Sequence, residues 1–407
     1  MTRRLAAAAV AGAIAASFAP PALAAEDPGA PPTRGSASIL MDARDGHVLA
    51  ADGAGERHPI ASTTKLMTAL LTLEQGGLGR VVTAARYDPL PAESKINLRP
   101  GERMRVKDLL VALLLESAND ASVTLADRVG GSRPAFVRAM NARAHRLGMD
   151  DTSYANPIGL DDPDNYSSAR DLAVLARTLM ARPTFRAIVD RPRATLRSGA
   201  RPRTLDNRNL LLGTAPFVDG VKTGHTGRAG YVLVGSASGR GARVISVVLG
   251  EPSEAAREGD SLALLRWGID QFRRERPVRA SRTLARPAVA DFDGRRVGLR
   301  AARDVALTVR RDQDVSTRIS APPELTGPLP AGRGVGTATV LVGGRAVRRV
   351  AIVTAGPVPE AGLIRRLSSG VSSVVLLTAA VLAVAALALL ARRRVGGSRR
   401  RRTPAAP

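Results

Sequence analysis

The stretch HPIASTTKLMTALLTLE, residues 58–74, carries the pattern from which the rest of the chain is interpreted. It places Ser62 and Lys65 three residues apart at the start of an apolar, helix-like run, so both side chains would share one helix face. The chain contains only four lysines beside 56 arginines. A serine becomes a nucleophile when a neighbouring group takes its proton; a buried lysine amine can do so, whereas an arginine cannot lose its proton. Taken alone, this spacing still favours an N-cap serine followed by a solvated lysine.

Two further polar motifs follow this stretch. Ser117-x-Asn119 separates two apolar, helix-like segments, and there the hydroxyl would relay protons while the amide holds a peptide carbonyl. Lys222-Thr223-Gly224 lies in a strand-like segment whose cation, hydroxyl and backbone N–H groups would bind an extended peptide ending in a carboxylate, with Gly224 allowing close backbone approach. Taken singly, the two motifs are as well explained by an ordinary helix–helix turn and by a hairpin strand with a surface lysine.

The two chain ends carry targeting patterns. Two arginines, an apolar run over residues 5–16 and small residues at 22–24 predict a secretory signal over residues 1–24, too short in its apolar part for a membrane anchor. Residues 371–391 contain no charge and no proline, and at about 1.5 Å per residue they would span a bilayer; the alternative is a buried core helix. Seven arginines within residues 392–407 predict a cytoplasmic tail, so we expect a single-pass protein of the cell membrane with its catalytic part outside the cytoplasm.

The composition excludes several kinds of chemistry. No cysteine is present, which excludes disulfides, thiol nucleophiles and thiolate metal sites. The four histidines show no pairing at ligand spacing, so we expect no metal and no other cofactor. The formal net charge is +24, but aromatic residues make up only 3% of the chain, too few for base stacking. We interpret the charge as adhesion to anionic wall polymers and lipids, and expect no nucleic acid partner.

Composition and periodicity divide the exported part into segments. Residues 25–35 are a short linker rich in proline and glycine. Residues 36–275 combine helix-like segments with groups of strand-like segments, which predicts an α+β domain rather than an alternating parallel sheet. Residues 276–356 consist of short alternating segments broken by proline and glycine, and they predict a small all-β domain. Residues 357–370 would link this domain to the apolar segment.

Taken in order, the three motifs form the trio of penicillin-binding proteins and class A β-lactamases. Further stretches of the chain match one family beside this trio, namely ILMDARDGHVLA, ESANDAS, ANPIGLDD and DGVKTGHTGRAGYVLVGSA. Through them the chain resembles the D-alanyl-D-alanine carboxypeptidases, the low-molecular-mass penicillin-binding proteins of serine peptidase family S11. The resemblance implies a β-lactamase/transpeptidase-like catalytic domain, in which an antiparallel sheet has flanking helices and a helical lobe. The chain departs from the family pattern at Tyr166, where many members have histidine, and in its full membrane span.

The resemblance also implies roles for individual residues. Ser62 would be the acylated nucleophile and Lys65 its base, while Ser117 and Asn119 would line the opposite side of the cleft. The backbone N–H groups of Ser62 and His225 would form the oxyanion hole. The positions that would bind the substrate, including two arginines that orient its carboxylate, are Lys222, Thr223, Gly224, His225, Arg208 and Arg257.

We therefore predict an exported, membrane-anchored serine carboxypeptidase. It would remove the terminal D-Ala from peptidoglycan stem peptides that end in D-Ala-D-Ala, and β-lactams would inhibit it. A class A β-lactamase is one alternative, but it needs a glutamate between the second and third motifs, and none occurs from Ser117 through Lys222. A non-catalytic wall-binding scaffold is the other alternative, and it gives no reason for the presence of both motif lysines.

Overall fold

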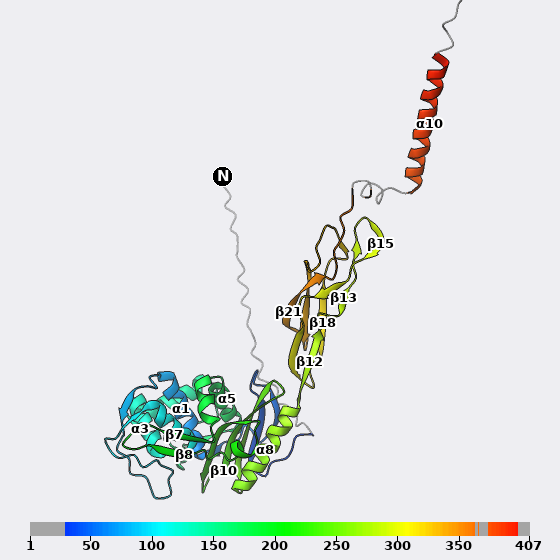
Figure 1. Ribbon diagram of the computed structural model, residues 1–407. Coiled ribbons are helices and arrows are strands. Elements are labelled where there is room, and N and C mark those ends of the chain that lie inside the picture. Colours follow the sequence, from blue (N-terminus) through cyan, green and yellow to red (C-terminus); the bar gives the residue numbers. More distant parts are fainter. Residues whose placement is uncertain (1–28, 363–364, 366–372, 398–407) are drawn as a thin grey trace, which may run out of the picture. The chain divides into compact units, whose positions relative to one another are not determined.

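The computed structural model describes residues 29–362, 365 and 373–397 (Figure 1). The chain divides into two compact units between Gln271 and Phe272. The predicted secretory signal and the beginning of the predicted linker after it lie outside the described residues. The domain limits inferred from the sequence stay predictions.

The first unit is built around a five-stranded antiparallel sheet with the strand order β2-β1-β11-β10-β9. Its strands are β1 (Ala37–Asp42), β2 (Val48–Asp52), β9 (Val218–Thr226), β10 (Gly230–Gly239) and β11 (Ala242–Glu251). The tight turn between β10 and β11 has positive φ at Arg240 and Gly241, as the twist of a two-residue hairpin requires. β9 forms one edge of this sheet, and within the described residues no further strand pairs with its outer side.

Side chains of this sheet point alternately to two helical layers. Ile39 and Met41 belong to the large apolar core that also contains α5 (Ala169–Met180). Leu40 points to the other face, where a Cβ added to Gly268 would lie 2.7 Å from its Cδ2. Gly268 belongs to α8 (Glu254–Asp270), so α8 covers one face and α5 covers the other (Figure 1).

The remaining helices of the first unit form a lobe. They are η1 (Ala61–Thr64), a 3₁₀ turn, and α1 (Lys65–Gln75), α2 (Val106–Leu115), α3 (Asn119–Gly130), α4 (Arg133–Arg146), α6 (Pro183–Val189) and α7 (Leu211–Thr214). All residues of 109–115 in α2 are buried, which places this helix in the core of the lobe. The end of α2 at Leu115 and the start of α3 at Asn119 confirm the break predicted around the second motif.

Three two-stranded sheets complete the first unit. They are β3 (His58–Pro59) with β6 (Tyr166–Ser167), β4 (Val81–Thr83) with β5 (Arg103–Arg105), and β7 (Arg193–Leu196) with β8 (Arg203–Asp206). Residues 84–102 connect β4 to β5, and a buried ion pair of 2.8 Å between Glu102 and Arg203 holds the end of this connection. Helices around an antiparallel sheet confirm the predicted α+β class.

In the second unit, residues 272–354 form strands of two to ten residues around their own apolar core. One sheet has the order β13-β16-β21-β20-β18, and smaller sheets pair β12 with β17 and β15-β14-β19. The strands are β12 (Phe272–Val278), β13 (Thr283–Ala285), β14 (Ala288–Val289), β15 (Phe292–Arg296), β16 (Leu299–Ala301), β17 (Val305–Arg310), β18 (Val315–Ser320), β19 (Glu324–Leu325), β20 (Gly334–Val342) and β21 (Arg345–Thr354). The β-rich character expected of this region is therefore observed.

One further helix, α10 (Ser373–Gly397), overlaps the segment predicted to cross a membrane. The structure does not confirm that prediction. Within the described ranges, no helix has both the length and the apolar character that a membrane crossing requires. The last ten residues of the predicted cytoplasmic tail lie outside the described residues.

Candidate active site

Ser62 and Lys65 are in direct contact at the start of α1. Ser62 lies in η1, and Lys65 is the first residue of α1. The Lys65 Nζ donates a hydrogen bond to Ser62 Oγ at 2.8 Å and another to the carbonyl oxygen of Ile158. Burial of Lys65, together with the charge of Lys222, lowers its pKa well below the ordinary value. The amine therefore lies within reach of the serine proton, in surroundings that favour its neutral form.

The carbonyl that accepts from Lys65 belongs to a tight loop organised by Asn156. The Asn156 Oδ1 accepts hydrogen bonds from three successive backbone N–H groups, residues 158–160, at 3.2, 2.7 and 3.2 Å. Gly159 has a φ of +87°, and a Cβ there would lie 2.0 Å from the carbonyl oxygen of Ala61. The sequence ANPIGLDD entered the prediction only through the family resemblance, whereas the structure shows that this loop holds the lysine.

Ser117 and Asn119 occupy the break between α2 and α3. Ser117 has a φ of +65°, and such a backbone conformation costs a non-glycine residue about 1–3 kcal/mol. Its hydroxyl is buried and finds no hydrogen-bond partner among the residues that the structure describes. A strained residue with an unpaired buried hydroxyl is expected where a bound ligand completes the hydrogen bonding.

Lys222, Thr223 and Gly224 lie on the edge strand β9, next to η1. A Cβ at Gly224 would lie 3.0 Å from the backbone nitrogen of Ser62 and 3.1 Å from the Cβ of Ala61. Lys222 and Thr223 are buried, and Lys222 Nζ donates a hydrogen bond to the carbonyl oxygen of Thr223 at 2.8 Å. The third motif is therefore in contact with the turn that carries the first.

Two arginines act electrostatically on Lys222. Burial and the charges of Arg208 and Arg257 lower the pKa of Lys222 to about 7. Arg208 forms an ion pair with Glu116, the residue directly before the second motif, and its side chain is 55% exposed. Arg257 is a buried residue of α8 that pairs with two glutamates of the same helix. A carboxylate ligand among these three cations would offset their mutual repulsion.

His225 follows the third motif on β9 and is exposed. Its ring lies against that of Tyr231 on the neighbouring strand β10, with 4.1 Å between the ring centroids. The guanidinium of Arg257 lies 5.7 Å from the centroid of the same tyrosine ring. Tyr231 thus connects two of the predicted site residues, a contact that no pattern in the sequence indicated.

The structure adds Glu93, a residue that the sequence did not single out. The Glu93 Oε2 accepts a hydrogen bond from Asn119 Nδ2 at 2.6 Å. Its charge also acts on Lys65, whose pKa it raises against the stronger effects of burial and Lys222. Glu93 lies between the first and second motifs, whereas the β-lactamase pattern directs a search for glutamate to the region after the second.

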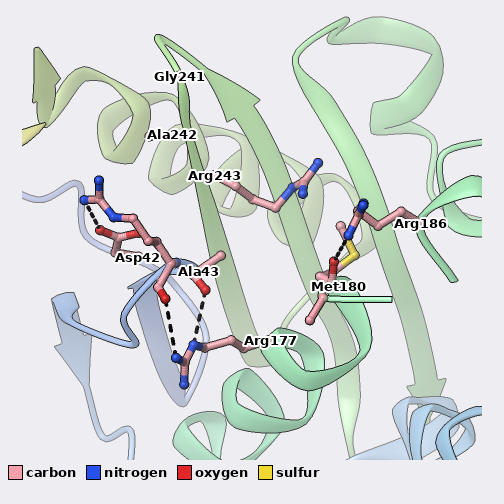
Figure 2. A pocket seen from close by; sticks show the side chains of 10 residues that line it. Asp42, Ala43, Arg177, Met180, Arg186, Gly241, Ala242 and Arg243 are labelled. Atoms are coloured by element: carbon pink, nitrogen blue, oxygen red, sulfur yellow. Dashed lines mark hydrogen bonds and ion pairs between the residues drawn. The ribbon is translucent and has the colours of Figure 1, made fainter. Parts of the chain in front are cut away.

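A separate cavity of about 280 Å³ is lined by residues of β1, α5, α6 and β11 and of the turns beside them. Figure 2 shows arginine side chains from three elements around it: Arg177 on α5, Arg186 on α6 and Arg243 on β11. None of the ten predicted site residues lines this cavity. Over the described residues, no group of three or more His, Cys, Asp or Glu side chains is arranged to hold a metal ion.

An antiparallel sheet between two helical layers, with a Ser–Lys pair beside its edge strand, defines a serine-type hydrolase. Residues 24–253 match the peptidase S11 family of D-alanyl-D-alanine carboxypeptidases. The chain belongs to this family, as its motifs predicted.

Named relatives and solved structures agree with the family match. The carboxypeptidase DacC of Escherichia coli K12 is 35% identical over 367 residues, which cover 86% of this chain and 91% of DacC. Penicillin binding protein 5 from Haemophilus influenzae is similar in structure, with a TM-score of 0.58 and 32% identity, over 81% of this chain and 99% of that one. The Streptomyces K15 DD-transpeptidase has a TM-score of 0.56 and 32% identity, over 59% of this chain and 99% of that one.

Proposed function

We propose that this carboxypeptidase acts through an acyl-enzyme formed on Ser62. The neutral Lys65 amine takes the proton of Ser62 Oγ, which attacks the carbonyl carbon of the penultimate D-Ala. The peptide bond breaks, the proton passes to the amine of the leaving D-Ala, and water then hydrolyses the ester. The observation that carries this proposal is the 2.8 Å hydrogen bond between the Nζ of the fully buried Lys65 and the Oγ of Ser62, which is partly buried.

The oxyanion formed during attack would be bound by the backbone N–H groups of Ser62 and His225. The contact between Gly224 and the Ser62 nitrogen supports this proposal, because it brings the two chain segments together. Backbone donors held in this way are already oriented before charge develops on the substrate oxygen. No side chain at residue 224 separates the two N–H groups.

The stem peptide would lie along β9 as an additional extended strand. Its C-terminal carboxylate would be held by Lys222 and Thr223, with the charges of Arg208 and Arg257 assisting. In support, Lys222 is affected by both arginines in the free enzyme. On the opposite side, the unpaired hydroxyl of Ser117 would exchange protons with the leaving group, and the Asn119 amide would hold a peptide carbonyl.

β-Lactams would acylate Ser62, because their strained amide imitates the D-Ala-D-Ala bond and would meet the same groups. The curated relatives are named as carboxypeptidases, which favours this activity over a β-lactamase or a non-catalytic wall-binding scaffold. Transfer of the acyl group to an amine instead of water is a second candidate, favoured by the similarity to a DD-transpeptidase. Added glycine that is incorporated into the product would reveal it.

The test is D-alanine release from a diacylated peptide ending in D-Ala-D-Ala by the purified full-length chain. Ser62→Ala should release none, while Ser281→Ala, at an exposed serine of the second unit, should behave as wild type. Mass spectrometry after penicillin treatment should place the adduct on the peptide that contains Ser62. Release that persists in Ser62→Ala would exclude Ser62 as the nucleophile.

We further propose that the protein is exported and attached to the membrane. The proposal rests on the secretory pattern of residues 1–24 and the apolar run 371–391 followed by arginines. Exposed large apolar side chains along α10, such as Leu382, Val384 and Leu387, are in keeping with attachment at this end. Fractionation of cells should find the full-length chain in the membrane and a chain ending at residue 362 in the soluble exported fraction.

A further inference from the structure

Residues 84–102, which connect β4 to β5, lie against the start of α3. Two groups at the beginning of that helix hold this connection: the backbone N–H of Asn119 donates to the carbonyl oxygen of Ser94 at 2.8 Å, and the carboxylate of Asp120 accepts from the backbone of Ile96 and Leu98 at 3.2 and 2.9 Å. These three hydrogen bonds tie the segment to the start of α3 through backbone atoms and Asp120. They leave the side-chain amide of Asn119 free to take part in other contacts.

Glu93 makes a different kind of contact from the same segment. Its Oε2 accepts from the Asn119 amide at 2.6 Å and from the hydroxyl of Tyr87, while its Oε1 accepts from the backbone N–H of Leu90 at 3.0 Å. An ionised carboxylate only accepts hydrogen bonds, so it selects the NH₂ end of the amide. One N–H and the Oδ1 of Asn119 then remain for the substrate, in a defined orientation.

Glu93 stays ionised in this setting. Burial acts to raise its pKa, but the hydrogen bonds from Tyr87, Asn119 and Leu90, and the charge of Lys65, together lower it below the usual range. The interaction is mutual, because Glu93 stabilises the protonated amine of Lys65 while burial and Lys222 oppose it. Of the two charged residues that shift the pKa of Lys65, Lys222 and Glu93, only Glu93 is negative.

We propose that Glu93 is a positioning residue of the active site, whose carboxylate orients the Asn119 amide for the substrate and whose negative charge acts on the Lys65 amine. The inference rests on the proposed roles of Ser62 and Lys65. It differs from the β-lactamase arrangement, because Glu93 precedes the second motif and its two oxygens already accept three hydrogen bonds from the protein. Its effect therefore passes through Asn119 and Lys65 and requires no contact with water or substrate.

Two substitutions separate the two effects in the full-length enzyme. Glu93→Gln keeps an oxygen that can accept from Asn119 but removes the charge, so the pKa of Lys65 should fall and the acidic limb of the kcat/KM profile should move to lower pH. Glu93→Ala removes the charge and the acceptor. It should show the same shift and, on the alkaline side of that limb, a further loss of kcat/KM of about 10- to 100-fold from the misplaced amide.

The measurements are pH profiles of D-alanine release and of acylation by a fluorescent penicillin. Glu324→Gln, at an exposed glutamate of the second unit, is the matched control and should leave the profile unchanged. If Glu93 had a purely structural role, its substitution would lower activity without moving the acidic limb. Glu93→Gln keeps the shape of the side chain, so lower activity with an unmoved acidic limb in this variant would overturn the inference. A wild type that releases no D-alanine would overturn the proposed function itself, whereas normal wild-type release matched by both variants would overturn only the role of Glu93.

Discussion

Gly224 on β9 lies so close to Ser62 that a Cβ added to the glycine would be 3.0 Å from the serine nitrogen. The carbonyl oxygen of Ile60 would be 3.2 Å from the same Cβ, so the crowding involves backbone atoms that cannot turn away. The edge strand and the turn that carries the serine can therefore lie this close without displacement because residue 224 has no side chain.

Gly224→Ala should push β9 and η1 apart. We expect kcat/KM to fall by about 100-fold, because displacements below 1 Å already disturb catalytic alignment, with a loss of unfolding free energy of ~1–3 kcal/mol. Gly227→Ala is the matched control, since a Cβ there meets nothing within 4 Å. Equal activity of the two variants would show that the contact with Ser62 does not matter for catalysis.

Lys65→Arg tests whether the amine must lose its proton. The guanidinium keeps the positive charge but cannot act as a base, so acylation by a fluorescent penicillin should slow by about 10²- to 10⁴-fold. Lys107→Arg, at an exposed position of α2, should acylate at the wild-type rate. Because Lys65 is fully buried, Lys65→Met provides a second variant that is easier to pack, and it should be equally slow. Rapid acylation of either variant would contradict the role of Lys65 as base.

The pKa of Lys222, about 7, predicts a pH dependence of substrate capture. Lys222 must be protonated to bind a carboxylate, so kcat/KM should decline as the pH rises through about 7. Arg208→Gln removes a charge that lowers this pKa, and the alkaline limb should move to higher pH even though overall affinity is reduced. An alkaline limb that stays in place would assign it to another group.

Glu251 at the end of β11 predicts a pH dependence of stability. It is buried, and burial together with the charge of Asp260 raises its pKa from 4.5 to about 7. The folded state then holds a proton that the unfolded state releases, so the unfolding free energy should fall as the pH rises from about 4.5 to about 7. Glu251→Gln removes this loss: thermal unfolding at pH 8 should occur at a higher temperature than in wild type, with little difference at pH 5. Equal shifts at both pH values would contradict the explanation.

The sequence was sufficient for the α+β class, the break between α2 and α3 and the family, because these depend on periodicity and on rare residue types such as lysine in this chain. It could not reveal Glu93 or Asn156. Both act through contacts with residues distant in sequence, Glu93 with Asn119 and the Asn156 loop with Lys65, and both lie in irregular segments without periodicity. The membrane span was predicted from an uncharged apolar run followed by seven arginines, and the described helices do not confirm it.

The burial of Lys65 and Lys222 has a consequence for labelling the protein. Only two other lysines exist, Lys107 on the surface and Lys95, whose Nζ donates to backbone carbonyls in the segment that carries Glu93. Reagents that acylate free amines should therefore spare Lys65 and Lys222 and modify few positions on the folded chain. A fluorophore attached at Lys95 would lie near the start of α3, where its emission could report β-lactam binding in real time without a substitution near the nucleophile.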